Sequence, residues 1–209
     1  NTRPLFTLLS ENQSGIDFRN DLSYTEKINP YTFRNFYNGA GVAIGDINQD
    51  GLPDIFFASN QQSNTLYLNT GNLAFEDITA KAGLISTGSW STGVSMADVN
   101  GDGLSDIIIG APDLVNGGTA SAGKAYVVFG QSTGTAINVT ELNAGTSSKG
   151  YVINGVGGVT DEKFGGPVAG AGDVNGDGIA DVVIGDALGN AYVVFGKTNG
   201  TAINASNLG

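Results

Sequence analysis

The sequence contains no cysteine and no histidine, and it has only 9 Lys and Arg against 20 Asp and Glu. The lack of cysteine excludes a disulfide framework, a thiol nucleophile and a thiolate metal site. The formal net charge of −11 would repel phosphate backbones and anionic lipid surfaces, which argues against nucleic-acid binding. A surface of this charge is instead suited to collecting cations.

The sequence also lacks an apolar run near the roughly 20 residues that span a bilayer, so we expect no membrane insertion. No basic and apolar leader stands at Asn1, so we expect no signal peptide within this sequence. The 209 residues are 40% hydrophobic and include 33 glycines but 5 prolines, which predicts a globular chain with a sizeable core and many turns.

Three acidic segments repeat along the chain: GVAIGDINQDGLPDIFFAS, GVSMADVNGDGLSDIIIGA and PVAGAGDVNGDGIADVVIGD. Their loops begin at Asp46, Asp98 and Asp173. Each loop stands between a short apolar run and a run of β-branched or aromatic residues, a pattern typical of strand, loop and strand. A second repeat supports the first, because residues 123–138 and 189–204 match at twelve of sixteen positions.

Each unit therefore supplies an inner strand, an acidic loop, a second strand and a third strand. A fourth strand is expected in AFEDITAKAGL of the first unit and SSKGYVINGV of the second. This pattern predicts an all-β propeller of four-stranded antiparallel blades, with three blades in the chain. A β-sandwich with similar hairpins is the alternative.

The expected organisation is a single propeller domain over 1–209. Residues 1–35 would form an outer strand and lead-in, and the blades would cover 36–85, 86–157 and 158–209, the last without a fourth strand of its own.

The loop D-x-N-x-D-G-x-x-D has the chemistry of a calcium site. Asp98, Asn100 and Asp102 alternate, the carbonyl of Leu104 can point inward, and Asp106 can close the far side. These are oxygen donors only, which Ca²⁺ prefers and binds with about six to eight ligands. Mg²⁺ is the weaker candidate because it demands stricter octahedral geometry. The alternative is a metal-free Asn/Asp/Gly turn, but three loops that keep the same acids at the same positions favour an ion.

These loops, together with EKFGGPVAGAGDVNGDGIADVVIG, resemble the FG-GAP repeats of the integrin α-chain propeller. Residues 1–100 are more similar to the related VCBS-type repeats of secreted bacterial proteins. The resemblance implies a secreted or cell-surface protein with three Ca²⁺ sites. The implied ligands are Asp46, Asn48, Asp50, Leu52 and Asp54; Asp98, Asn100, Asp102, Leu104 and Asp106; and Asp173, Asn175, Asp177, Ile179 and Asp181.

The sequence changes from the VCBS-type to the FG-GAP type of repeat near Asp98, so one hypothesis is that two parent sequences were joined there. A mosaic natural gene would look the same. The first two blades also lack a clean FG-GAP cage, with NFYNGAG and GSWSTG in its place.

The sequence indicates no enzyme. There is no histidine base or cysteine nucleophile, and nine of the twenty acids belong to the three loops. The pair Asp161 and Glu162 could be offered as an acid and a base, but adjacency does not place both on one substrate. We expect these two residues, like Glu76 and Asp77, to be solvated charges.

Three functions stay open: a calcium-stabilised interaction or adhesion module, a structural or engineered scaffold without ligand, and the accessory propeller of a secreted enzyme. An extracellular protein or a glycan is the expected ligand of the first. Candidate ligand loops are Ser59 to Asn64 and Ala111 to Ala122, although the second could be only a flexible connector.

Finally, residues Gly15 to Asn20 show the apolar alternation of GYVING. They could supply the fourth strand that the third blade lacks. Within a ring of three blades this closure would be strained, so the expectation is a homodimer that closes a six-bladed ring. The alternative is that the chain is a piece of a longer propeller.

Overall fold

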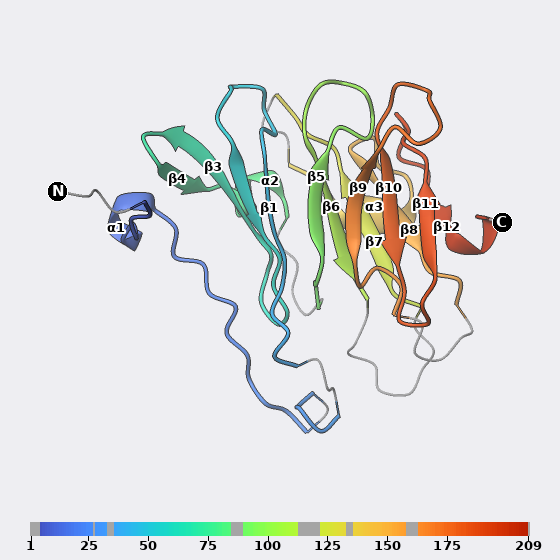
Figure 1. Cartoon of the computed structure of the whole chain (residues 1–209), viewed down its shortest axis with the longest axis horizontal. Coiled ribbons are helices and arrows are strands. Elements are labelled where there is room, and N and C mark those ends of the chain that lie inside the picture. The colour runs from blue at the N-terminus through green and yellow to red at the C-terminus, as the bar shows by residue number, and fades with distance from the viewer. Residues whose placement is uncertain are drawn as a thin grey trace.

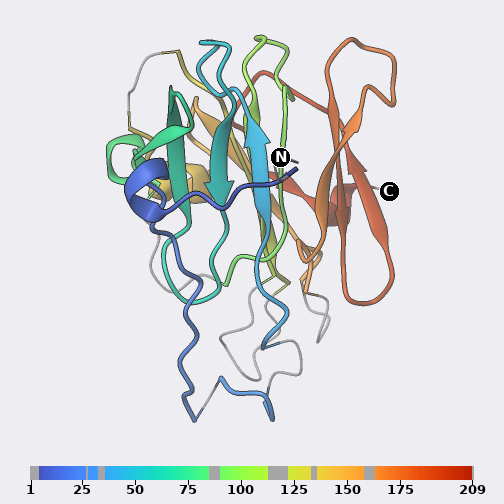
Figure 2. The same ribbon diagram turned by 60° about the vertical axis from the view of Figure 1, so that its left-hand side comes forward.

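The structure is a computed structural model that describes residues 5–26, 28–32, 36–84, 90–112, 122–132, 136–157 and 163–208. Its core consists of three β-sheets that stand side by side in chain order (Figures 1 and 2). The first helix and the last strand lie at opposite ends of the long axis of the molecule (Figure 1).

Sheet 1 is antiparallel and has the order β1-β2-β3-β4. Its strands are β1 (Val42–Gly45), β2 (Asp54–Phe57), β3 (Thr65–Gly71) and β4 (Ala74–Asp77). A short helix, α2 (Thr79–Ala82), follows the last strand. The expected fourth strand in AFEDITAKAGL is thus present as β4.

Sheet 2 contains the antiparallel set β5-β6-β7-β8 and a fifth, parallel strand at its outer edge. The four are β5 (Val94–Ala97), β6 (Asp106–Ala111), β7 (Lys124–Val128) and β8 (Gly150–Asn154), with α3 (Val139–Ala144) between the last two. The fifth strand, β12 (Ile203–Asn204), comes from the C-terminal part of the chain and is followed by a 3₁₀ helix at Ala205–Asn207. The sequence analysis had no prediction for this parallel strand.

Sheet 3 has three antiparallel strands in the order β11-β10-β9. They are β9 (Val168–Gly172), β10 (Asp181–Gly185) and β11 (Ala191–Val194). Among the described residues, no fourth strand joins this sheet.

Alternating side chains of each sheet fill the two spaces between the sheets. Phe56 and Leu66 of sheet 1 pack against Ile107, Ile109 and Val128 of sheet 2. The opposite face of sheet 2 packs on sheet 3 in a cluster that contains Ile108, Val127, Tyr151, Val182, Ile184 and Val194. Full burial of one such side chain is worth about 1.5–3 kcal/mol, so these two layers hold the sheets together.

Aromatic residues and close backbone contacts fix the inner ends of the sheets. Phe164, of the FG-G segment, is fully buried, and the N–H of Gly93 donates to the carbonyl of Gly166. Where sheets 1 and 2 meet, the N–H of Gly41 donates to the carbonyl of Thr92. The ring centroid of buried Phe36 lies 5.9 Å from that of Trp90. The missing FG-GAP cage of the first two units is therefore replaced by other aromatic residues, and the sheets still pack.

The N-terminal part begins with a single helical turn, α1 (Glu11–Ser14), which has a capping box between Ser10 and Gln13. An extended segment then runs along the outer face of sheet 1, the face turned away from sheet 2 (Figure 1). Gly15 has a φ of 75° and approaches the carbonyl of Phe75 so closely that a Cβ would lie 2.3 Å from its oxygen. Within the chain, Gly15 to Asn20 do not form a strand.

Candidate metal centre

The three acidic loops close the hairpins between the first and second strands of the sheets. The register places Gly45 opposite Asp54 in sheet 1, and Ala97 and Gly172 hold the same place in sheets 2 and 3. The ninth residue of each loop is therefore also the first residue of a strand. Glycine at the sixth position has a φ of 81° to 88° in all three loops, which side chains rarely adopt.

The first aspartate of each loop accepts backbone hydrogen bonds from the following residues. In the second loop, Asp98 accepts the N–H groups of Gly101 at 2.8 Å, Asp102 at 3.2 Å and Gly103 at 2.9 Å. Asp46 and Asp173 do the same in the other two loops. This carboxylate thus organises the turn of the loop.

The third and fifth residues of each loop are paired. The amide of Asn100 accepts the backbone N–H of Asp102 at 2.9 Å and donates to its carboxylate at 2.9 Å. The other carboxylate oxygen of Asp102 accepts the N–H of Leu104. The corresponding bonds form in the first loop between Asn48 and Asp50. They form in the third loop between Asn175 and Asp177.

The aspartate at the ninth position is fully buried in every loop, at 0% exposure for Asp54, Asp106 and Asp181. One oxygen of Asp106 accepts the N–H of Val99, inside the loop, at 2.8 Å. The other oxygen accepts the N–H of Gly130, just beyond the third strand, also at 2.8 Å. This residue therefore ties the loop to a strand that is distant in sequence.

The same pair of bonds recurs in the other sheets. Asp54 accepts from Ile47 and Asn69, and Asp181 accepts from Val174 and Gly196. Sequence reasoning assigned the ninth position only to metal binding and missed this second role. No local signal reveals the role, because the second donor lies 15 to 24 residues away.

The electrostatics of the loops favour a bound cation. Burial raises the pKa of Asp106 to about 7, the two backbone donors lower it, and the nearby charges of Asp102 and Asp98 raise it further. Burial also raises the pKa of Asp54. For Asp46, burial acts upward, but the N–H groups of residues 48 to 51 outweigh it and the pKa lies below its ordinary value. A cation among these carboxylates would relieve their mutual repulsion.

Neighbouring loops also touch one another. The side chain of Gln49 donates to the carbonyl of Gly103 at 2.7 Å, so the first loop contacts the second. Ile179 of the third loop lies near Gly101 of the second. In the third loop Asp173, Asn175 and Asp177 are all exposed.

The predicted ligand residues of each loop lie within one nine-residue turn, so the structure brings each set into one neighbourhood. In the described residues, however, no group of three or more acidic side chains is arranged to hold an ion. The first and fifth aspartates bind backbone N–H groups instead. The donor set nevertheless fits calcium chemically, since it offers carboxylate and amide oxygens, and a carboxylate oxygen that accepts one N–H retains a second lone pair.

Other predicted positions have different outcomes. Asp161, Glu162 and most of the loop from Ala111 to Ala122 lie outside the described residues. In the loop from Ser59 to Asn64, the side chain of Asn60 donates to Ser91 and pairs with Asn20, and Ser59 and Asn64 bond to each other. This loop therefore serves internal packing, although Gln61 at its tip contacts Ser23 of the N-terminal segment.

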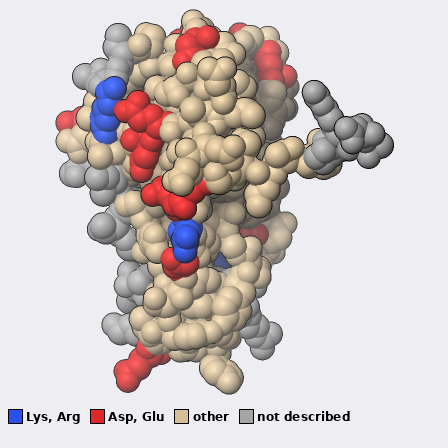
Figure 3. Space-filling view, turned by 90° about the vertical axis from the view of Figure 1, so that its left-hand side faces the viewer, with Lys and Arg blue, Asp and Glu red and all other residues tan. Residues whose placement is uncertain are grey.

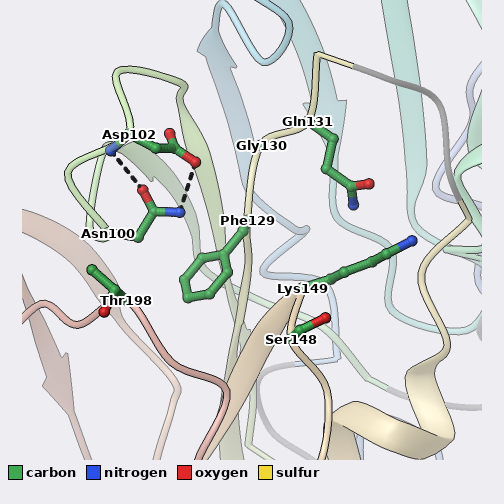
Figure 4. A pocket seen from close by; sticks show the side chains of 8 residues that line it. All are labelled: Asn100, Asp102, Phe129, Gly130, Gln131, Ser148, Lys149 and Thr198. Carbon is green, nitrogen blue, oxygen red and sulfur yellow. Dashed lines mark hydrogen bonds between the residues drawn. The ribbon is translucent and has the colours of Figure 1, made fainter.

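Beside the second loop lies a pocket of about 350 Å³. Asn100 and Asp102 line one side, and Gln131 and Lys149 line the other, with the ring of Phe129 between them (Figure 4). The Lys149 side chain extends away from this ring, and its Nζ donates to the carbonyl of Ala136 at 2.9 Å (Figure 4). Sequence reasoning missed the pocket, because its residues come from separate turns.

The comparison with protein families agrees with this geometry. Sequence models of the FG-GAP-like repeat and of the FG-GAP repeat match residues 46–109 and 91–128, which contain the first two loops. The chain carries FG-GAP repeats. The resemblance noted in the sequence is therefore confirmed, and the matched residues run from the first acidic loop to the end of β7.

Several curated relatives contain similar sequences. The chain is 31% identical to integrin alpha pat-2 of Caenorhabditis elegans over 177 residues, 78% of this chain and 14% of that protein. It is 39% identical to mouse cartilage acidic protein 1 over 72 residues, and this stretch is 34% of this chain and 11% of that protein. It is 23% identical over 201 residues to mouse phosphatidylinositol-glycan-specific phospholipase D, 92% of this chain and 22% of that protein. The chain spans less than a quarter of the length of these relatives.

Proposed function

We propose that this chain is a calcium-binding, propeller-type interaction module of extracellular proteins. One observation carries the proposal: three acidic loops of the same D-x-N-x-D-G-x-x-D pattern recur at the same place in three sheets, each with a buried aspartate at its ninth position. Hairpin turns alone do not require three carboxylates, and a buried carboxylate is costly unless it is paired. Similarity to integrin alpha chains supports an adhesion role.

The ligands would come from the side chains at the first, third, fifth and ninth positions and from the carbonyl at the seventh. Bound calcium would supply positive charge to the loop, and the pKa of Asp106 would fall accordingly. The residues of the loop would hold its shape around the ion. Asp98 orders the turn, Asn100 and Asp102 lock each other, and Asp106 carries the order of the loop to the third strand.

The pocket beside Asp102 gives such a module a place for a ligand. The Asp102 carboxylate, the Gln131 amide and the aromatic ring that line it would suit a polar partner such as a glycan or a protein side chain. No helix among the described residues is long and apolar enough to cross a membrane.

Two measurements test the proposal separately. Isothermal titration with CaCl₂ should show three sites per chain, and Asp102→Ala should leave two. Capture of the purified chain on arrays of extracellular glycans and matrix proteins should depend on millimolar calcium. Titration without heat would end the calcium assignment, whereas calcium binding without calcium-dependent capture would leave a structural scaffold.

A second function is favoured by a relative that matches 92% of the chain, phosphatidylinositol-glycan-specific phospholipase D. The chain would then be the accessory propeller of a secreted enzyme, as the sequence analysis also allowed. In the described residues the loop acids make structural bonds, so we do not expect hydrolysis by this chain alone. Hydrolysis of a phosphatidylinositol-glycan substrate by the purified chain would contradict this expectation.

A further inference from the structure

The third sheet has an open edge. The third strands of sheets 1 and 2, β3 and β7, each pair with a fourth strand, but β11 pairs only with β10. Among the described residues nothing covers its outer side. An unpaired edge presents a row of backbone N–H and C=O groups and is a template for another strand.

The third sheet also has an open face. Three residues that are buried in sheet 2 have exposed counterparts in sheet 3. By the strand registers the pairs are Val99 with Val174, Val127 with Val193, and Phe129 with Phe195. Exposure rises from 0%, 0% and 6% in sheet 2 to 59%, 42% and 55% in sheet 3. In sheet 2 this face is covered by the next sheet, so the face of sheet 3 is built to receive another sheet.

Sheet 1 offers the matching surface. In the pairing of β1 with β2, Val42 lies opposite Phe57 and Ile44 lies opposite Ile55, on the face turned away from sheet 2. Val42 and Ile44 are 54% and 64% exposed. Most of the view of this side in Figure 3 carries neither acidic nor basic side chains. The two open faces therefore complement each other as sheets 1 and 2 do.

The N-terminal segment occupies the place of a fourth strand on that surface. In the contact between sheets 2 and 3, Tyr151 and Ile153 of β8 pack with Ile184 and Val194. By the strand registers, Phe57 and Tyr67 of sheet 1 are the counterparts of Ile184 and Val194. The ring of Phe18 stacks on Phe57 at 4.7 Å between centroids, and Asp17 accepts the hydroxyl of Tyr67 at 2.7 Å.

The segment is also prepared for pairing. A helical turn precedes it, as α3 precedes β8, and a glycine begins both stretches, Gly15 here and Gly150 there. Residues 16–24 make no backbone-to-backbone hydrogen bond with any other described residue. The N–H groups of Ile16, Asp17 and Ser23 donate to the side chains of Ser14, Tyr67 and Gln61. The backbone groups of residues 18–22 make no hydrogen bond with a described residue.

This segment cannot reach β11 of its own chain, because the two lie at opposite ends of the long axis (Figure 1). We propose that Gly15 to Asn20 form the fourth strand of sheet 3 in a second copy of the chain. A reciprocal exchange between two copies joins six sheets into one ring, within the range of about four to eight blades for closed propellers. It covers both open faces and pairs both free edges.

The lack of cysteine allows a direct test by cross-linking. In sheet 2, Val127 lies opposite Tyr151. The same register places Val193 of one copy opposite Ile16 of the other. Chains with Ile16→Cys and chains with Val193→Cys, mixed and oxidised, should form a disulfide-linked heterodimer. A mixture of Val193→Cys with Leu8→Cys, upstream of the segment, should not. An equal yield from both mixtures, or none from the first, would overturn the proposal.

Light scattering gives a second, independent readout. The unmodified chain should have twice the mass of the 21.3 kDa monomer. Phe195→Asp places a charge on the open face and should give a folded monomer. Leu188→Asp, at a similarly exposed turn of the same sheet, should stay dimeric. A monomeric unmodified chain, or a dimer that survives deletion of residues 1–20, would show that no such exchange occurs.

Discussion

The carboxylate of Asp106 accepts the backbone N–H of Gly130 at 2.8 Å across a sequence separation of 24 residues. Through this bond an acidic loop that looks like a local metal site also holds the third strand of its sheet. The same carboxylate accepts the N–H of Val99, so it joins the two ends of one structural unit. Metal binding and folding therefore share this residue.

We predict that Asp106→Ala destabilises the chain even in a chelator. The substitution leaves two buried N–H groups without an acceptor, and each costs about 1–3 kcal/mol. Asp102→Ala removes an exposed side chain and should cost less than about 1 kcal/mol in the chelator, while it abolishes one calcium site. Urea unfolding in EDTA measures the loss of stability in the two variants, with Glu76→Ala as the control for the lost charge. Equal losses in the two variants would contradict the structural role of Asp106.

We predict that calcium raises the melting temperature. At ten times the dissociation constant one site contributes about 1.4 kcal/mol, and three independent sites about 4 kcal/mol. This is a large share of the roughly 5–15 kcal/mol that stabilises a typical domain. Extracellular modules often bind calcium at about 10⁻⁴ to 10⁻³ M, so scanning calorimetry should compare millimolar Ca²⁺, Mg²⁺ and EDTA. Superimposable curves would remove calcium from the account of these loops.

We predict that Gly130→Ala is destabilising by about 1–3 kcal/mol, because it overpacks the contact between the segment that follows β7 and the second acidic loop. A Cβ at this position would lie 2.7 Å from the Cβ of Leu104 and 2.8 Å from the carbonyl oxygen of Ser105. Gly166→Ala is the matched control, since its Cβ would meet nothing closer than 3.5 Å. Thermal unfolding of the two variants should separate them, and a neutral Gly130→Ala would refute the close approach.

We predict that Tyr67→Phe loosens the N-terminal segment. Burial and the hydrogen bond to Asp17 raise the pKa of Tyr67 to about 12, so the fold favours the neutral hydroxyl. The contribution to stability is complete below about pH 10, the ordinary value, and is lost as the pH rises toward 12. Tyr67→Phe should cost about 1 kcal/mol near neutral pH and should speed hydrogen exchange of the Asp17 N–H, which donates to the Tyr67 hydroxyl at 3.3 Å. It should also reduce the loss of stability above pH 10; unchanged exchange in the segment would show that Phe18 alone anchors it.

The repeated units could be predicted from the sequence. Runs of β-branched and aromatic residues predicted the strands that the structure shows as β6 and β7, and acids at fixed spacing predicted the loop that begins at Asp98. These features are local, because strand periodicity and turn chemistry depend on neighbouring residues. The fourth strands of the first two sheets were predicted correctly for the same reason.

Contacts between distant parts of the chain could not be predicted from the sequence. The N–H of Gly130 reaches Asp106, β12 pairs in parallel with β8, and Phe18 stacks on Phe57. Each of these contacts depends on how the sheets stack, and no periodicity within a single segment encodes it. The burial of Asp106 could not be predicted either, because it results from the packing of the sheets and not from the sequence of the loop.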